Sequence, residues 1–100
     1  MNFKYNAVFE KKGQSVYISH LDLMMVLSRA IRRSGLPFVV TKGFTPKVKI
    51  SIPKALKLGK ESENEEMGLW FTEDVSGEVI KDRINCFLPE GVKIKDVSKS

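Results

Sequence analysis

The chain opens with an alternation of apolar and polar residues between Phe3 and Glu10. Apolar side chains occupy every second position of this segment, at Phe3, Tyr5, Ala7 and Phe9. A period of two is typical of a strand that buries one face and exposes the other. We therefore predict a strand over residues 3–10, followed by a turn at residues 11–14 and a short extended entry at residues 16–18.

The next segment has the period of a helix. Ser19 is a favourable N-cap, and Asp22 lies in the first turn, where a negative charge suits the helix dipole. Gly35 is a typical C-terminal stop, and Pro37 prevents continuation. The apolar face that should pack on the core is formed by Leu23, Met24, Leu27, Ala30 and Ile31. The opposite face carries Asp22, Met25, Arg29, Arg32 and Arg33.

Three strands are predicted next. Residues 38–41 (FVVT) are apolar and β-branched, and residues 48–52 alternate, with Val48, Ile50 and Ile52 on one side. The Lys42–Lys47 turn, which contains Gly43 and Pro46, joins these two strands. Residues 54–64 are polar, and we predict an irregular segment there. Residues 67–72 (MGLWFT) form an apolar strand, in which one of Trp70 and Phe71 should be buried and the other exposed.

The C-terminal part repeats the change from helix to strand. A helix is predicted over residues 76–88, with a buried face formed by Val79, Ile80, Ile84 and either Phe87 or Leu88. Pro89 and Gly91 end it, and Val92, Ile94 and Val97 outline a last strand. The order of elements predicts one α+β domain over residues 1–100, a ferredoxin-like split β-α-β sandwich: an antiparallel sheet with two helices on one face.

Charge is distributed unevenly along this pattern. The net charge is +5, but residues 1–60 hold 12 Lys and Arg against two acids, and residues 61–100 hold five against ten. A cationic first half of this kind suits an anionic partner such as nucleic acid. The acidic second half argues against a simple polycation.

Composition also bears on location. No apolar run approaches the ~18–20 residues that span a bilayer, and the first residues show no export signal. Cys86 is the single cysteine, so no internal disulfide can form. We expect a cytoplasmic protein with no membrane contact.

The candidate nucleic-acid contacts lie in two groups, the arginine face of the first helix and the turn that follows. An aromatic side chain among lysines can stack on a base while the lysines contact phosphates. For the arginines, the alternative is that they stabilise the helix C-terminus. For Phe44, the alternative is a core position beneath the turn. The candidates are Arg29, Arg32, Arg33, Lys42, Phe44, Lys47 and Lys49.

His20 is the single histidine, and it begins the first helix beside Ser19. It is a weak catalytic candidate, because imidazole can act as a general acid–base in RNA cleavage without a metal. The alternative is a half-buried helix-cap histidine that forms local hydrogen bonds. No cysteine pair or nucleotide-binding glycine motif occurs, and the glutamates at 61–66 fit no calcium loop. We therefore expect no metal site and no cofactor.

Three segments together resemble a known family. They are ISHLDL at residues 18–23, RAIRRSGLP at residues 29–37 and KGFTP at residues 42–46. They are similar to the motifs of a family of bacterial domains of unknown function called radical SAM-linked proteins. The resemblance continues through Leu58-Gly59 and the acidic residues 61–66. Residues 55–58 (ALKL) depart from it, since the family has a Pro-Leu pair there.

The resemblance implies a neighbouring or fused radical SAM enzyme, often with a cobalamin-binding region, and a longer domain of which these residues form the N-terminal half. It does not imply radical chemistry in this chain. Three functional hypotheses remain open. The preferred one is a non-catalytic RNA-binding or substrate-presenting module that serves an RNA-modifying partner. The others are a metal-independent ribonuclease that uses His20, and a protein-interaction domain that docks on a radical SAM enzyme. The oligomeric state stays open.

Overall fold

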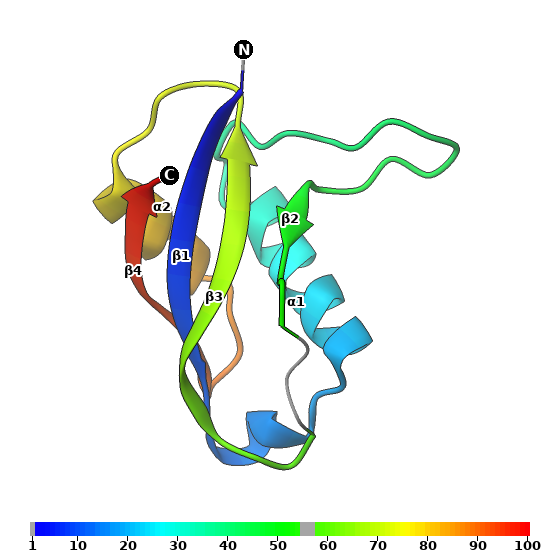
Figure 1. The fold of residues 1–100 in the computed structure, drawn as a ribbon, viewed down its shortest axis with the longest axis vertical. Helices are drawn as coiled ribbons and strands as arrows, with labels where there is room; N and C mark the ends of the chain where they lie inside the picture. Colours follow the sequence, from blue (N-terminus) through cyan, green and yellow to red (C-terminus); the bar gives the residue numbers. More distant parts are fainter. Residues whose placement is uncertain (1, 55–57) are drawn as a thin grey trace.

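The protein folds as one antiparallel sheet with two helices packed on one of its faces (Figure 1). The computed structural model describes residues 2–54 and 58–100. Its elements, in chain order, are β1 (Phe3–Lys11), the 3-10 helix η1 (Gly13–Tyr17), α1 (His20–Arg33), β2 (Ile50–Ser51), β3 (Ser62–Phe71), α2 (Gly77–Asn85) and β4 (Val92–Lys99). The strands lie in the order β2-β3-β1-β4, and every neighbouring pair is antiparallel.

This arrangement confirms the predicted ferredoxin-like split β-α-β fold. β1 is a central strand and pairs with β3 on one side and β4 on the other. α1 and α2 lie on the same face of the sheet and leave the other face open. None of the helices in the described residues is long and apolar enough to cross a membrane.

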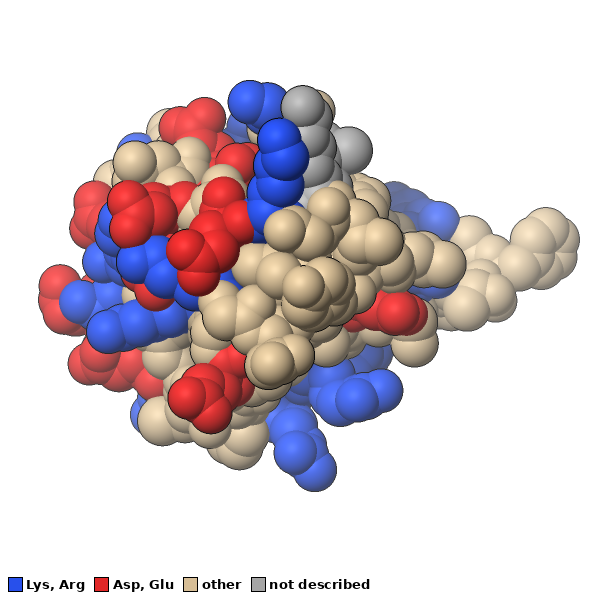
Figure 2. Space-filling view, turned by 90° about the horizontal axis from the view of Figure 1, so that it is seen from below, with Lys and Arg blue, Asp and Glu red and all other residues tan. Residues whose placement is uncertain are grey.

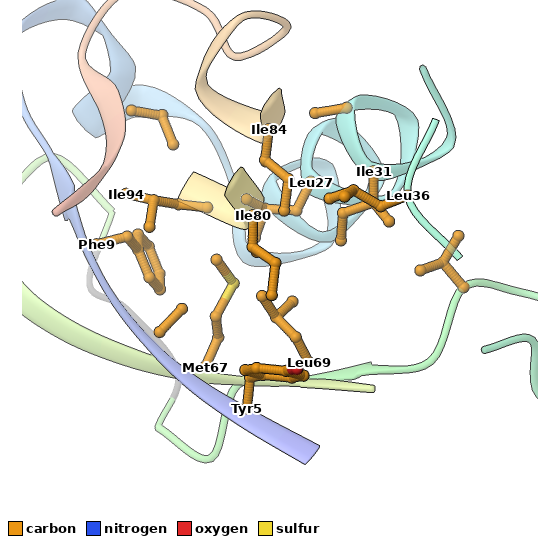
Figure 3. Close-up of a cluster of buried hydrophobic side chains, with 14 of the residues drawn as sticks. Tyr5, Phe9, Leu27, Ile31, Leu36, Met67, Leu69, Ile80, Ile84 and Ile94 are labelled. Carbon is orange, nitrogen blue, oxygen red and sulfur yellow. The ribbon is translucent and has the colours of Figure 1, made fainter. Parts of the chain in front are cut away.

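The core lies between the sheet and the two helices (Figure 3). Tyr5, Ala7 and Phe9 of β1 are fully buried, as their alternation predicts. Met67, Leu69 and Phe71 of β3 lie beside them, and the helices contribute Leu27, Ile31, Ile80 and Ile84. Burial of these side chains supplies the main driving force for folding.

The boundaries of α1 follow its caps. Ser19 Oγ accepts a hydrogen bond from Asp22 N at 3.1 Å, which satisfies one of the free amides of the first turn. Gly35 follows the helix with a φ of 78°, a conformation that suits glycine. Leu23, Leu27, Ala30 and Ile31 are buried as predicted, but Met24 is only half-buried.

Three predicted boundaries are wrong. Residues 38–41 form no strand but only two isolated bridges, Phe38 with Phe71 and Val40 with Val48, and β2 is reduced to Ile50–Ser51. The acidic run predicted to be irregular instead extends β3 back to Ser62, because strand β1 offers it partners as far as Lys11. Residues 13–17 form η1 in place of an extended entry.

The second helix differs from the prediction in its length and in the burial of Val79. Ser76 is its N-cap and Ile80 and Ile84 are buried, but Val79 and Phe87 are exposed and Leu88 packs against the core. The helix is shorter than predicted because it ends at Asn85. Asn85 exchanges side-chain hydrogen bonds with the backbone of Ile94 in β4. Residues 55–57, where the sequence departs from the family motif, lie outside the described residues.

One buried hydroxyl ties the connection before α2 to the sheet. The Tyr5 hydroxyl accepts a hydrogen bond from Val75 N (2.8 Å) and donates to Val75 O (2.7 Å), with Asp74 Oδ1 at 3.1 Å. The Tyr5 ring meets Phe71 edge to face, with centroids 5.5 Å apart. A phenol in the core is therefore paired at its polar end and packed at its apolar end.

We predict that Tyr5→Phe lowers the free energy of unfolding by about 1–3 kcal/mol, because both backbone groups of Val75 lose their partner in a part-buried site. Urea denaturation of the two proteins measures the difference. Tyr17→Phe is the matched control, since Tyr17 is exposed. Equal stability of Tyr5→Phe and the parent protein would contradict the assigned role.

A lysine is buried at the other end of β1. Lys11 is 1% exposed, and its Nζ donates to the carbonyl of Ile18 at 2.5 Å. Burial lowers the pKa of Lys11, because the ammonium ion loses its hydration. In the pH range between this lowered pKa and the ordinary 10.5, the unfolded chain binds more protons than the folded one. Lys11 therefore makes the protein more stable as the pH rises through that range.

We predict that Lys11→Met removes this alkaline contribution. The difference in unfolding free energy between Lys11→Met and the parent should shift in favour of the parent as the pH is raised toward 10.5. Urea denaturation at a series of pH values from neutral upward measures it. Comparison with the parent cancels the opposite contributions of Lys12 and Lys99, whose pKa values are raised by Glu63 and Asp74. A constant difference would show that the Lys11 pKa is not lowered.

Candidate nucleic-acid interface

A tryptophan lies between two lysines on the open face of the sheet. Trp70 is flanked in β3 by the buried Leu69 and Phe71, so its side chain points to the opposite, uncovered face. Lys4 is its partner in β1. On the other side, Val39 N donates to Trp70 O and Val39 O accepts from Lys49 N, and the Lys49 side chain reaches back over the indole. The three residues Lys4, Trp70 and Lys49, here called the Trp70 cluster, bring their side chains together on this face.

The geometry within the Trp70 cluster is close. The Nζ atom of Lys4 lies 5.3 Å from the indole centroid, and the Nζ atom of Lys49 lies 4.9 Å from it. Both distances are in the range of cation–π attraction. The indole rests on Gly68, where an added Cβ would come within 3.0 Å of Trp70 Cη2. Glycine therefore gives the ring room to lie against the sheet.

Charge changes sign along this face. In register, Lys4 is opposite Trp70, Asn6 is opposite Gly68, and Val8 is opposite both Glu66 and Asp96. Asn6 Nδ2 lies 3.5 Å from Glu66 Oε1. The end of the sheet with the Trp70 cluster is thus cationic and aromatic, and the next residues along the strands are acidic. Farther along the strands the charges are mixed, because Lys95 Nζ there donates to Glu63 O and Asn64 Oδ1.

The predicted turn is a projecting arm, residues 41–47, which extends beyond the edge of the sheet (Figure 1). Thr41 N donates to Lys47 O at 2.7 Å and closes its base. Phe44 at its tip is fully exposed, so the alternative of a core position beneath the turn is wrong. Lys42 is exposed on the same arm. The arm begins next to the Trp70 cluster, since Val39 pairs with the backbone of both Trp70 and Lys49.

The other predicted cations lie elsewhere. Arg29, Arg32 and Lys47 line a groove between α1 and β2 together with Val48 and Ile50. Lys49 points away from this groove, because it alternates with Val48 and Ile50 along the chain. Arg32 also lies 5.5 Å from the ring of Phe38, and Arg33 is exposed. The sheet therefore separates the predicted basic surface into two sites.

The end of the molecule opposite the Trp70 cluster carries charges of both signs. Figure 2 shows basic and acidic side chains interspersed on one side and a broad uncharged area between them and the arm. The cations do not merge into one patch on this face. The excess of Lys and Arg in residues 1–60 of the sequence therefore does not produce one continuous basic patch on this face.

His20 lies half-buried at the first position of α1. Its Nδ1 atom is buried and has no hydrogen-bond partner among the described residues, so the predicted local bond is absent there. The parts of the chain that the structure describes hold no group of three or more His, Cys, Asp and Glu residues placed to bind a metal ion. The arrangement suits binding by stacking and charge more than proton transfer.

Sequence reasoning missed Lys4. Its position in an alternating segment places it on the face opposite Tyr5, but only the β1–β3 register brings it to Trp70. Phe71 is buried and Trp70 is half-buried on the open face, which confirms that the two aromatic residues face opposite sides, although Trp70 is not fully exposed.

Comparison with known proteins gives one match. Residues 4–100 match the family model described as "Uncharacterized protein conserved in bacteria (DUF2344)". No curated protein matches the chain. The matched range includes all the helices and strands described above, apart from the first residue of β1, and it includes the arm.

We predict that Gly68→Ala displaces the indole of Trp70 from the sheet, because the new methyl group would approach the ring to 3.0 Å. Trp70 is the single tryptophan, so its fluorescence reports the change directly. Emission should move to longer wavelength and become more sensitive to acrylamide quenching. Ser51→Ala, at the neighbouring position of β2, is the control and should leave the emission unchanged. Unaltered emission in Gly68→Ala would contradict the packing described.

Proposed function

Because this chain belongs to the DUF2344 family of uncharacterized proteins conserved in bacteria, whose description states no activity, we propose its function from its surface: a non-catalytic module that binds single-stranded RNA. The observation that carries the proposal is the Trp70 cluster, an aromatic platform between two lysines on an open sheet face. Proteins bind single strands by stacking bases on aromatic side chains while cations follow the phosphates.

An energetic comparison supports stacking at this position. The lysines over the Trp70 ring gain about 0.5–1 kcal/mol each from an exposed cation–π contact. A base stacked on an aromatic side chain gains about 1–3 kcal/mol. A base can therefore take the place of an ammonium group over the indole, and the displaced lysine then pairs with a phosphate. The Trp70 cluster supplies an aromatic ring for the base and two ammonium groups for phosphates at one place.

The arm extends this surface. Phe44 adds a fully exposed aromatic side chain to the half-buried Trp70, and Lys42 lies two residues before it. Base and phosphate contacts on the arm would lengthen the bound segment beyond the sheet edge. The acidic positions Glu66 and Asp96 limit the strand to the other end of the sheet, since they repel phosphates.

The proposal includes presentation of the bound RNA to a modifying enzyme. The likeness to radical SAM-linked proteins suggests that enzyme's class, and a cytoplasmic location goes with it. A ribonuclease role for His20 receives less support, because its Nδ1 has no partner in the described residues that would orient the ring or accept its proton.

The test is binding of a fluorescein-labelled oligouridine to the whole chain, followed by anisotropy. Trp70→Ala should weaken binding about 5- to 100-fold, which corresponds to the loss of one stacked base. Lys4→Met and Lys49→Met should each reduce the slope of log affinity against log salt by about 0.7, the value for one phosphate on a single strand.

Phe87→Ala is the matched control, because Phe87 is an exposed aromatic residue two residues after α2, a helix that lies on the other face of the sheet from Trp70. It should leave affinity unchanged. No binding at low salt, or equal affinity of Trp70→Ala and the parent, would overturn the proposal. Cleavage of the oligonucleotide that is lost in His20→Ala would replace it with the enzymatic alternative.

A further inference from the structure

A second surface lies on the opposite side of the sheet edge from the Trp70 cluster. It is an open groove of about 460 Å³ between α1 and the β2 edge. The helix lines it with Leu21, Met24, Met25, Ser28, Arg29 and Arg32, and the β2 side lines it with Lys47, Val48 and Ile50. We call it the α1–β2 groove.

The α1 residues of the groove form a single stripe. They recur at intervals of three and four residues, so they lie above one another on one side of the helix. This stripe is separate from the one that packs on the core, which consists of Leu23, Leu27, Ala30 and Ile31. The helix thus carries a second stripe with apolar residues, and the described chain does not cover Leu21 and Met25 on it.

The apolar end of the stripe is widely open to solvent. Leu21 is 71% exposed and Met25 is 53% exposed, although both are large apolar residues. A small molecule within the groove would leave their outer surfaces in water. An occupant that covers them has to reach over α1, as a segment of another protein can. Methionine side chains suit such a surface, because they adapt to the shape of what they contact.

The other end of the stripe is cationic. Arg29 and Arg32 occupy its last turns, and Lys47 faces them from the β2 side. Asp22, on the first turn of α1, does not line the groove. An occupant that covers the apolar end therefore meets three positive charges with no acidic residue among the lining side chains. Charge complementarity calls for carboxylates on the partner.

We propose that the α1–β2 groove binds an acidic amphipathic helix of a partner protein. Its apolar side chains, spaced at i, i+3, i+4 and i+7, pack on Leu21, Met25 and Ile50. Its Asp and Glu residues pair with Arg29, Arg32 and Lys47. The groove points away from the Trp70 cluster, so RNA and the partner helix can be held at the same time. This inference does not depend on the proposed RNA binding.

The test uses peptides of about 16 residues, long enough for four helical turns, displayed as a random library and selected on the whole chain. Selection is run in parallel on Met25→Glu, which alters an exposed residue and is checked for folding by circular dichroism. Peptides enriched on the parent and not on Met25→Glu should be acidic, with apolar residues at helical spacing. Val79→Glu, an exposed apolar position on α2, is the control and should select the same peptides as the parent.

The binding site is then read from methyl NMR of protein labelled at methionine. The best selected peptide should shift the Met24 and Met25 signals and leave Met67, a core residue, in place. Arg29→Glu should weaken this peptide about fivefold, and a peptide with lysine in place of the one acidic residue that pairs with position 29 should regain the loss.

Four results would overturn the inference. They are selected peptides without acidic character, no peptide that depends on Met25, displacement of the peptide by oligouridine, and Met24 and Met25 signals that move with protein concentration alone. The third would place RNA in the groove, and the fourth would place a second copy of this chain there. Failure of oligouridine to bind at Trp70 leaves all of these readings unaffected.

Discussion

The structure depends on the pairing of the central strand β1 with β3. This register sets Tyr5 opposite Leu69 and Ala7 opposite Met67, so the buried sides of both strands coincide beneath the helices. The same register sets Lys4 opposite Trp70 on the other face. A shift by one residue would expose the core side chains and bury the lysine, so hydrophobic burial fixes the surface cluster as firmly as it fixes the core.

This constraint also divides the basic surface. Consecutive residues 47–50 contribute to both faces: Lys47, Val48 and Ile50 face the α1–β2 groove, and Lys49 faces Trp70. Cations that are close in sequence therefore serve two surfaces with different chemistry. One is aromatic and open, and the other is apolar with a cationic end. The Trp70 cluster and the α1–β2 groove are therefore separate surfaces of one small domain.

Much of the fold was predictable from local patterns. The alternation in β1, the Ser19 cap and the Gly35 stop of α1, and the buried pair Ile80 and Ile84 each follow from rules that act within a few residues. The errors have a common cause. Residues 62–66 look like a polar loop, yet they extend β3 because β1 provides backbone partners for them. Residues 38–41 look like a strand, but the described chain pairs them only at two bridges.

The same distinction applies to the candidate sites: local sequence patterns predict which way a side chain faces, and long-range pairing decides which side chains lie together. The sequence by itself determined that Arg29 and Arg32 lie on the outer face of the first helix and that Trp70 and Phe71 face opposite sides, since helical and strand periods dictate both. Only the tertiary structure decided which of these residues meet. It brings Lys4 over Trp70 and places Met25 and the β2 edge along one groove, although these residues are far apart in the chain. These arrangements exist because burial of the core brings distant strands and helices into register, which no local period encodes.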